Sequence, residues 1–334
     1  GFVDIVCGDI DGEGRDKIIK INNNIVNDKD VVTFTVYKYL DTYGSIAKDY
    51  TREYSLNAIH TDKKNNKSLY PKYFYTGDFN GDGRIDIMAV FANTPFGTGS
   101  ETTTCYIFNL FENQIIYKGK PFKYNKLPNG VPNTEQKELY NLSDKLLVFD
   151  YNGDGKTDVC HINNDKLTCY TFDNTSWLKE RAIFTDTSIK NSVLRDQYLY
   201  IGDFNGDGLI DILNTPDKTT KWTSWTQYNS KGKNGMDLSK YDIASAEYSS
   251  TDGFIIQDVN NDGISDFIKY TPSGFTTFLS DGEKACINIG IETAFNGSNS
   301  ILIPLNITTY GKNTRLIGLK DGKVTKYILS RNDS

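Results

Sequence analysis

Short apolar runs alternate along the whole chain with turns rich in Gly, Asn and Asp. Runs of this kind, bounded by turn-forming residues, predict β-strands rather than helices. The pattern therefore predicts an all-β protein. The runs that precede the turns are Phe2–Cys7, Tyr73–Thr76, Leu146–Phe149, Leu199–Ile201 and Phe254–Ile256, and those that follow them include Ile87–Phe91, Val159–Ile162, Ile212–Leu213 and Phe267–Ile268.

One acidic phrase recurs in the turns between these runs. Its copies begin at Asp9, Asp78, Asp150, Asp203 and Asp258, so that successive copies lie 53 to 72 residues apart. A repeat of this length suits a four-stranded blade of a β-propeller, because stacked blades bury the sheet faces that one repeat cannot bury alone. The phrase would then be the loop between the first two strands of each blade.

Each repeat continues with a Thr-rich run that carries an aromatic residue, which we expect to fill the blade core, and then with a more polar fourth strand. The aromatic residues are Tyr37, Tyr106, Tyr170, Trp225 and Phe278, and the predicted fourth strands include Ser45–Tyr54, Ile115–Tyr124, Trp177–Phe184 and Lys284–Ile291. A sixth copy, at about residues 301–330, lacks the acidic phrase. We predict one propeller domain over residues 1–334 with six antiparallel blades, and seven blades as the alternative.

The start of the sequence bears on its origin. The chain begins with Gly1 and has no basic and then apolar leader. We therefore expect that it was cut from a longer chain.

The acidic phrase presents the oxygen ligands that calcium prefers. Its first, third, fifth and ninth residues carry three carboxylates and one amide oxygen, its sixth residue is a Gly that permits a sharp turn, and the backbone carbonyl of the seventh adds another oxygen. We predict about four Ca²⁺ ions. The predicted ligands are Asp78, Asn80, Asp82, Arg84 and Asp86; Asp150, Asn152, Asp154, Lys156 and Asp158; Asp203, Asn205, Asp207, Leu209 and Asp211; and Asp258, Asn260, Asp262, Ile264 and Asp266.

Two other interpretations of the phrase are weaker. A simple turn rich in Asp, Asn and Gly would explain one copy, but four copies with the same oxygen-bearing positions, whose like charges repel without a cation, favour a metal. An EF-hand needs a Glu at position 12 and flanking helices, whereas the flanks here are β-rich. The residues at position 12 are Ala89, His161, Asn214 and Lys269.

The first copy of the phrase departs from the others. Asp9, Asp11 and Glu13 occupy its first, third and fifth positions, but Lys17 occupies the ninth. We therefore expect poor or absent metal binding in this degenerate loop.

Composition excludes some classes of function. The formal net charge is −6, from 43 acidic and 37 basic residues, and no basic stripe suggests nucleic-acid binding. No apolar run is long enough to span a bilayer, so we expect no membrane insertion. The five cysteines are an odd number, which excludes a fully paired scaffold; Cys160 and Cys169 flank a turn and either form a disulfide or serve as small buried hydrophobic residues.

The acidic loops resemble the FG-GAP or VCBS-type repeat family, the calcium-loop propellers that include the integrin α-subunit head, some lectins and many bacterial surface and secreted proteins. This resemblance implies that the Asp and Asn residues named above are calcium ligands. The Phe-Gly and Gly-Ala-Pro signatures of the integrin version are mostly missing, so no integrin-like ligand is implied. The stretch Gly202–Asp211, with Trp222 and Trp225 following, is also similar to propellers of bacterial Tc-toxin B components and RHS-type proteins, in which the propeller is a docking and shell part.

Strand direction alternates within a blade, so we expect the calcium loops to line one face and the long insertions to lie mainly on the opposite face. Loops on a rigid scaffold often bind ligands. We therefore expect a protein or glycan ligand on that opposite face, although the insertions can equally be tolerated surface loops. The insertions are Asn22–Asp30, Asn57–Ser68, Asn93–Thr103, which contains the candidate anchor Phe96, and Lys118–Lys145.

The sequence favours a non-catalytic binding or scaffold module that recognises a protein partner or docks in a larger surface or toxin-like assembly. A calcium-dependent lectin is one alternative and a propeller enzyme is another. The chain has only two histidines, His60 and His161, no Gly-x-Ser-x-Gly motif, and carboxylate clusters already assigned to calcium, so we expect no enzyme. Because such loops suit millimolar extracellular calcium, we expect a secreted, periplasmic or cell-surface protein.

Overall fold

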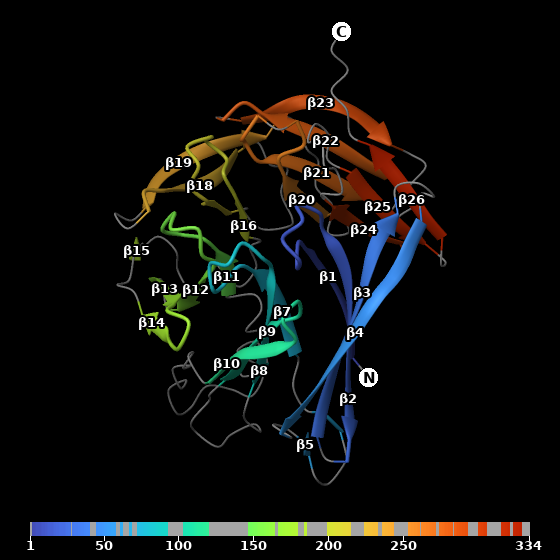
Figure 1. Cartoon of the computed structure of the whole chain (residues 1–334). Coiled ribbons are helices and arrows are strands. Elements are labelled where there is room, and N and C mark those ends of the chain that lie inside the picture. The colour runs from blue at the N-terminus through green and yellow to red at the C-terminus, as the bar shows by residue number, and fades with distance from the viewer. Residues whose placement is uncertain are drawn as a thin grey trace. The chain divides into compact units, whose positions relative to one another are not determined.

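The computed structural model shows β-strands as the only regular elements among the residues it describes (Figure 1). In the described segments, no helix is long and apolar enough to cross a membrane. The chain divides into two compact units, Gly1–Val148 with Tyr170–Lys179, and Phe149–Cys169 with Glu180–Ser334. The described residues are 2–27, 29–40, 45–57, 61–62, 67–68, 72–92, 103–119, 146–163, 166–179, 184–185, 199–214, 224–232, 236–243, 253–260, 262–271, 274–282, 284–292, 300–305, 315–320 and 323–328.

Unit 1 contains two four-stranded antiparallel sheets, in which each strand pairs with its neighbour in sequence. A small separate hairpin joins β5 (Thr61–Asp62) to β6 (Lys67–Ser68). The strands of the first sheet are β1 (Phe2–Gly8), β2 (Lys17–Val26), β3 (Lys29–Leu40) and β4 (Ser45–Asn57), and those of the second are β7 (Lys72–Gly77), β8 (Asp86–Ala92), β9 (Thr103–Asn109) and β10 (Gln114–Gly119).

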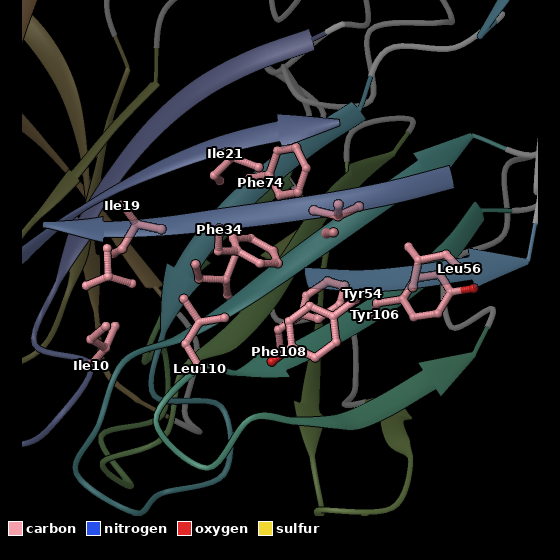
Figure 2. Close-up of a cluster of buried hydrophobic side chains, with 14 residues drawn as sticks. Ile10, Ile19, Ile21, Phe34, Tyr54, Leu56, Phe74, Tyr106, Phe108 and Leu110 are labelled. Atoms are coloured by element: carbon pink, nitrogen blue, oxygen red, sulfur yellow. The ribbon is translucent and has the colours of Figure 1, made fainter. Parts of the chain in front are cut away.

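The two sheets of unit 1 bury their faces in one core. Side chains along β3 alternate between buried and partly exposed, which places Phe34 inside. Figure 2 shows Phe34 beside Tyr54 and Phe108, and the Phe108 ring centroid lies 5.0 Å from that of Phe34 and 4.9 Å from that of Tyr54. Because Phe34 comes from β3 and Phe108 from β9, neighbouring sheets pack face to face.

A third sheet has the strand order β11-β12-β13-β14, with β15 paired to β13. It begins, like the first two, with strands that flank an acidic loop. Its strands are β11 (Leu146–Phe149), β12 (Asp158–Asn163), β13 (Lys166–Phe172), β14 (Trp177–Lys179) and β15 (Phe184–Thr185).

Unit 2 contains two further four-stranded meanders, which a short parallel pairing of β19 with β23 joins into one eight-stranded sheet. A three-stranded antiparallel sheet follows. The strands of the meanders are β16 (Leu199–Gly202), β17 (Asp211–Asn214), β18 (Ser224–Ser230), β19 (Met236–Ile243), β20 (Gly253–Gln257), β21 (Asp266–Thr271), β22 (Gly274–Ser280) and β23 (Lys284–Glu292), and those of the last sheet are β24 (Ser300–Leu305), β25 (Arg315–Lys320) and β26 (Lys323–Ile328).

The predicted all-β repeat is confirmed by this topology. Every acidic phrase joins the first two strands of an antiparallel meander, and the predicted starts of β4, β14 and β23 are correct. The strands β10 and β14 are described as far as Gly119 and Lys179, and their predicted continuations over residues 120–124 and 180–183 lie outside the described residues. The number of blades and their closure into a ring stay predictions.

The predicted insertion Asn22–Asp30 forms the end of a long hairpin instead of an irregular loop. β2 continues to Val26 and β3 starts at Lys29, and residues Ile18–Val26 pair with Lys29–Tyr37 up to a turn at Asn27. The polar side chains of this stretch do not prevent pairing, because the ladder is made by backbone N–H and C=O groups. Residues 93–102, which include Phe96, and 120–145 lie outside the described residues, so those insertions stay predictions.

The aromatic positions were aligned incorrectly in two repeats. The tenth residue of the phrase pairs with Tyr37, Phe108, Tyr228 and Phe278 in the four meanders whose register is known. Tyr106 therefore lies two residues before the equivalent position, and Trp225 lies three before it. The cause is the variable length of the hairpin between the second and third strands. Tyr106 is nevertheless buried, since residues two apart share a face of the strand.

Candidate metal loops

Five acidic loops connect the first and second strands of the meanders and share one backbone fold. Their second residues anchor the loops in the core, because all of them are buried. In the first four loops, glycines at the fourth and sixth positions have positive φ, as at Gly81 (76°) and Gly83 (80°), a region that residues with a Cβ rarely adopt, and the last loop has Gly263 (86°) at the sixth position. The anchoring residues are Ile10, Phe79, Tyr151, Phe204 and Val259.

The first Asp of each loop accepts hydrogen bonds from the backbone of its own loop. Asp78 Oδ1 accepts from the N–H groups of Gly81 at 2.7 Å and Asp82 at 3.1 Å, and Oδ2 accepts from Gly83 N–H at 2.8 Å. Asp150 and Asp203 accept the same three bonds. The carboxylate therefore organises the turn. In the first and last loops, Asp9 and Asp258 accept from the fifth and sixth residues.

The third and fifth residues extend this network. Asn80 Oδ1 accepts a 3.0 Å bond from Asp82 N–H, and Asp82 Oδ1 accepts a 2.9 Å bond from Arg84 N–H. The same two bonds recur in the three later loops. The structure thus brings together the predicted first, third, fifth and seventh residues of each phrase in one turn. The remaining residues of these sets are Asn152, Asp154 and Lys156; Asn205, Asp207 and Leu209; and Asn260, Asp262 and Ile264.

The ninth residue of the four intact loops is a fully buried carboxyl group. Burial is the main cause that raises the pKa of Asp86 to about 8, of Asp266 to about 7 and of Asp211 to about 6. Hydrogen bonds moderate the effect: the N–H groups of Ser230 and Ser280 donate to Asp211 Oδ1 and Asp266 Oδ1, both at 2.8 Å. The residues with no exposed surface at this position are Asp86, Asp158, Asp211 and Asp266.

Asp86 lacks this support. Within the described part of the chain, neither of its carboxylate oxygens has a hydrogen-bond partner, and Phe79 N–H acts on it only weakly. After burial, repulsion from Asp82 and Asp78 is the next cause of its raised pKa. A buried carboxyl group in such surroundings needs a proton or a cation to be stable.

The first loop has a cation of its own. Lys17 Nζ lies 2.7 Å from Asp11 Oδ2 and 3.6 Å from Glu13 Oε2, and the Lys17 side chain is only 7% exposed. Partial burial raises the pKa of Asp11, but the hydrogen bond and the charge of Lys17, together with hydrogen bonds that involve Asp9 and Glu13 N–H, outweigh burial, so that this pKa lies below its ordinary value.

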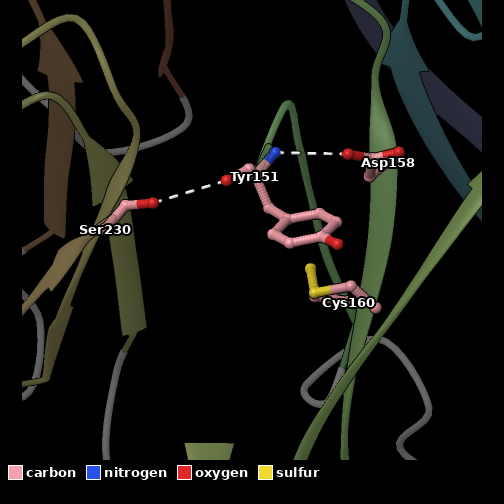
Figure 3. Close-up of a disulfide and its surroundings, with 5 residues drawn as sticks. Tyr151, Asp158, Cys160 and Ser230 are labelled. Atoms are coloured by element: carbon pink, nitrogen blue, oxygen red, sulfur yellow. Dashed lines mark hydrogen bonds between the residues drawn. A yellow bond between two sulfur atoms is a disulfide. The ribbon is translucent and has the colours of Figure 1, made fainter. Parts of the chain in front are cut away.

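Successive loops lie side by side within each unit. In unit 1, Ile85 N–H donates a 2.9 Å hydrogen bond to the backbone carbonyl of Asp9. In unit 2, Ser230 Oγ, at the end of a third strand, donates to the carbonyl of Tyr151 in the preceding loop at 3.3 Å (Figure 3). Within each unit, loops that are distant in sequence therefore meet at a common edge, as the strand directions predict.

A disulfide connects Cys160 of β12 to Cys169 of β13, and both residues are buried. Figure 3 shows Cys160 beside Tyr151, the anchoring residue of the same repeat's loop. The sequence left open whether these cysteines form a disulfide or serve as small buried hydrophobic residues, and the structure has the disulfide. Among the other cysteines, burial and then Asp16 raise the pKa of Cys7 to about 12, so its thiol stays protonated.

The loops fit calcium by the chemistry of their donors. In the described part of the chain, no three Asp, Glu, His or Cys side chains converge on one point in the manner of a preformed metal site. The loop oxygens accept N–H groups instead, but oxygens that accept one such bond, as Asp78 Oδ2 and Asp82 Oδ1 do, keep a further lone pair, and Asp86 offers two buried oxygens without hydrogen bonds. Three carboxylates and one amide oxygen in a loop are hard ligands of the kind that calcium takes.

Sequence reasoning missed the residues that support the ninth position from another strand. Ser230, Ser280 and Gln227 contact Asp211 or Asp266, although they lie 14 to 19 residues away in sequence. The signal that would have found them is a Ser two residues beyond the aromatic position, at Tyr228 and Phe278 alike. Of the two histidines, His60 and the side chain of His161 are not among the described groups.

Comparison with known proteins places one repeat in a family. Residues 150–214 match the model of the FG-GAP-like repeat. No curated protein matches the sequence.

Two solved structures share the fold over almost the whole chain. A lectin of Agrocybe aegerita, described as recognising non-reducing terminal N-acetylglucosamine, is 14% identical, with a TM-score of 0.56, over 99% of this chain and 80% of the lectin. A chain of the Photorhabdus luminescens Tc holotoxin pore is 14% identical, with a TM-score of 0.52, over 96% of this chain and 13% of the toxin chain. The chain therefore contains an FG-GAP-like repeat within a propeller-like β-fold.

Proposed function

We propose that the chain is a calcium-stabilised β-propeller of six blades that acts as a non-catalytic binding or scaffold module. The observation that carries the proposal is the fully buried Asp86, whose oxygens have no hydrogen bond among the described residues and face repulsion from two further carboxylates. A divalent cation would replace this repulsion by attraction and tie the strand that begins at Asp86 to its loop.

In each intact loop, the first, third, fifth and ninth side chains and the seventh carbonyl would hold the ion. At a free calcium concentration one hundred times the dissociation constant, each site would stabilise the folded state by about 2.7 kcal/mol. Four such sites equal the whole stability of many domains, which is typically about 5–15 kcal/mol. The module would then depend on calcium for its rigidity.

The partner would bind on the face opposite the loops. β2 begins at the ninth residue of its loop and runs for 10 residues to Val26. At about 3.3 Å per residue, the tip of the β2–β3 hairpin therefore lies roughly 30 Å from that loop. Its tip carries Val26, which is 50% exposed. A projecting, partly apolar hairpin suits contact with a protein.

An oxidising, calcium-rich compartment would suit the molecule. The disulfide between Cys160 and Cys169 favours an extracellular or periplasmic setting, since disulfides are rare in cytosolic proteins. Calcium loops of modest affinity require millimolar calcium, which occurs outside cells. The likeness to a small part of a Tc toxin chain supports a role within a larger surface or toxin-like assembly.

Calcium titration tests the proposal. We expect the midpoint of thermal unfolding to rise by at least about 10 °C from chelator to millimolar calcium, and equilibrium dialysis to find about four bound ions. Magnesium, which demands stricter octahedral geometry, should stabilise less. Identical melting in chelator and in calcium, with no bound ions, would refute calcium stabilisation.

A calcium-dependent lectin is the second candidate, and the fold shared with the Agrocybe aegerita lectin favours it. A glycan array in millimolar calcium, with terminal N-acetylglucosamine among its sugars, separates the candidates. Binding that chelator abolishes would support the lectin. An array without hits leaves the protein-binding module, and release of free sugar from a bound glycan would instead identify an enzyme.

A further inference from the structure

The first acidic loop has the same backbone as the others but a different distribution of charge. Gly12 and Gly14 have φ values of 74° and 75°, against 76° and 80° for Gly81 and Gly83. Asp9 accepts the N–H groups of the fifth and sixth residues, at 3.1 and 2.7 Å, as the first Asp of each other loop does. Replacement of the ninth residue has therefore not unfolded the loop.

Two substitutions occur together in this loop. The third residue is Asn in the four intact loops and Asp11 here, while the ninth is Asp in those loops and Lys17 here. The two new side chains contact each other, since Lys17 Nζ lies 2.7 Å from Asp11 Oδ2. Compared with the intact loops, the first loop thus has a carboxylate instead of an amide at the third position and an ammonium group instead of a carboxylate at the ninth.

The ammonium group lies where a cation is needed. Lys17 is 7% exposed, and its second contact, with Glu13 Oε2 at 3.6 Å, is to the fifth residue of the phrase. Lys17 therefore bridges the third and fifth residues, two of the positions whose oxygens would hold calcium in the intact loops. A lysine ammonium carries three hydrogen-bond donors and a full charge, so it can neutralise this loop without a metal.

We propose that the Lys17 ammonium replaces the metal ion in the first loop and acts as a built-in cation. This inference rests on the proposed binding of calcium by the other four loops. The first loop would stay folded when calcium is removed. It would also hold the next loop in place, because the Asp9 carbonyl accepts the 2.9 Å hydrogen bond from Ile85 N–H. Unit 1 would thus keep one ordered loop at any calcium concentration.

The variant Asp11→Asn tests the inference by removing the nearest partner of the ammonium group. We expect the melting midpoint to fall by about 3 °C, and by the same amount in chelator and in calcium, because no metal is involved. The matched variant Asp82→Asn, in the second loop, should lower the midpoint mainly in calcium. A fall for Asp11→Asn that occurs only in calcium would overturn the proposal.

The variant Lys17→Asp restores the ninth carboxylate and should create a new site. Equilibrium dialysis should find one more calcium ion per chain than in the wild type, and the variant should melt lower in chelator. The control Lys38→Asp makes the same charge change at a residue that pairs with Asp49 at 3.1 Å outside any loop, and it should bind no extra ion. Equal ion counts for Lys17→Asp and the wild type would overturn the inference.

The two hypotheses can fail separately. A wild type that binds no calcium refutes the proposed function. In that case, the melting of Asp11→Asn in chelator still tests whether the Lys17 ammonium stabilises the first loop. This measurement requires no metal, and it does not require that the variant Lys17→Asp folds. Unchanged melting of Asp11→Asn in chelator would then count against the built-in cation.

Discussion

The N–H group of Ser265 donates a 2.7 Å hydrogen bond to the backbone carbonyl of Asp203. The two residues belong to successive acidic loops, so neither loop can shift without disturbing the other. Ile85 and Asp9 form the same bond in unit 1, at 2.9 Å. Packing reinforces the connection, because a Cβ added at Gly202 would lie 2.7 Å from Ser265 Oγ and 2.8 Å from its Cβ. Neighbouring loops therefore form one structural pair.

Replacement of Gly202 by Ala should destabilise the protein by about 1–3 kcal/mol, because the new methyl group overlaps Ser265 and Ile256. Thermal unfolding in chelator measures the loss. In the double variant Gly202→Ala/Ser265→Gly, part of the loss should return, since most of the overlapping atoms are gone. Strictly additive losses in this double-mutant cycle would count against the pairing of the loops.

Replacement of Asp86 by Asn should have opposite effects with and without calcium. In chelator near pH 8, the variant should melt higher than the wild type, because it removes a buried carboxyl group that repels Asp82 and Asp78. In millimolar calcium it should melt lower and bind one ion fewer, because a ligand is lost. Differential scanning fluorimetry in the two buffers measures both effects.

The variant Asp211→Asn is the matched control for this sign change. Asp211 already accepts hydrogen bonds from Ser230 N–H and Gln227 Nε2, so an Asn there gains less in chelator. In millimolar calcium, the melting midpoint should fall by a similar amount in Asp86→Asn and in Asp211→Asn. If Asp86→Asn destabilised the protein in chelator as much as in calcium, Asp86 would have a purely structural role.

The loops and first strands were predictable from sequence because they depend on local interactions. Within the described segments, the side chain of Asp78 bonds to residues three to five positions away, and the glycines beside it satisfy a local backbone requirement. The conformation of each acidic loop is therefore determined mainly by residues of the loop itself. The same locality let the start of β4 at Ser45 and of β23 at Lys284 be predicted correctly.

The features that the sequence did not predict depend on contacts between residues that are distant in the sequence. The bond from Ser230 N–H to Asp211 joins residues 19 apart, and the register that sets it follows from hairpin length rather than from composition. The segment around Asn27 was predicted as a loop insertion, yet the pairing of β2 with β3 makes it the end of a hairpin. Lys17 looked like a defect in sequence, and only its 2.7 Å contact with Asp11 shows an ion pair.

In chelator, stability should fall as the pH rises from about 4 to about 8. The ordinary pKa of an Asp carboxyl is 3.8, whereas the folded protein raises that of Asp211 to about 6, of Asp266 to about 7 and of Asp86 to about 8. The folded state therefore binds protons more tightly than the unfolded state, and this stabilisation is complete below pH 3.8 and lost as each group ionises.

Calcium should reverse this slope, because the metal binds the ionised carboxylates and competes with protons. Melting midpoints measured from pH 4 to pH 8.5 in both buffers test the expectation. The triple variant Asp86→Asn/Asp211→Asn/Asp266→Asn is the control, since it removes the three shifted groups and should flatten the profile in chelator. A wild-type profile in chelator that is as flat as that of the triple variant would contradict the assignment of the pH dependence to these three carboxyl groups.

The disulfide should stabilise the protein independently of calcium. Cys160 and Cys169 are nine residues apart, and closing a loop of that size is worth about 3 kcal/mol through the entropy of the unfolded chain. Cys160→Ala/Cys169→Ala should therefore melt lower than the wild type by a similar amount in chelator and in calcium, and reductant should have no further effect on it. The control Cys7→Ser keeps the disulfide and should stay sensitive to reductant. If the double variant instead lost calcium affinity at the loop of Asp150, the disulfide would act by positioning β12, whose first residue is the ninth-position Asp158.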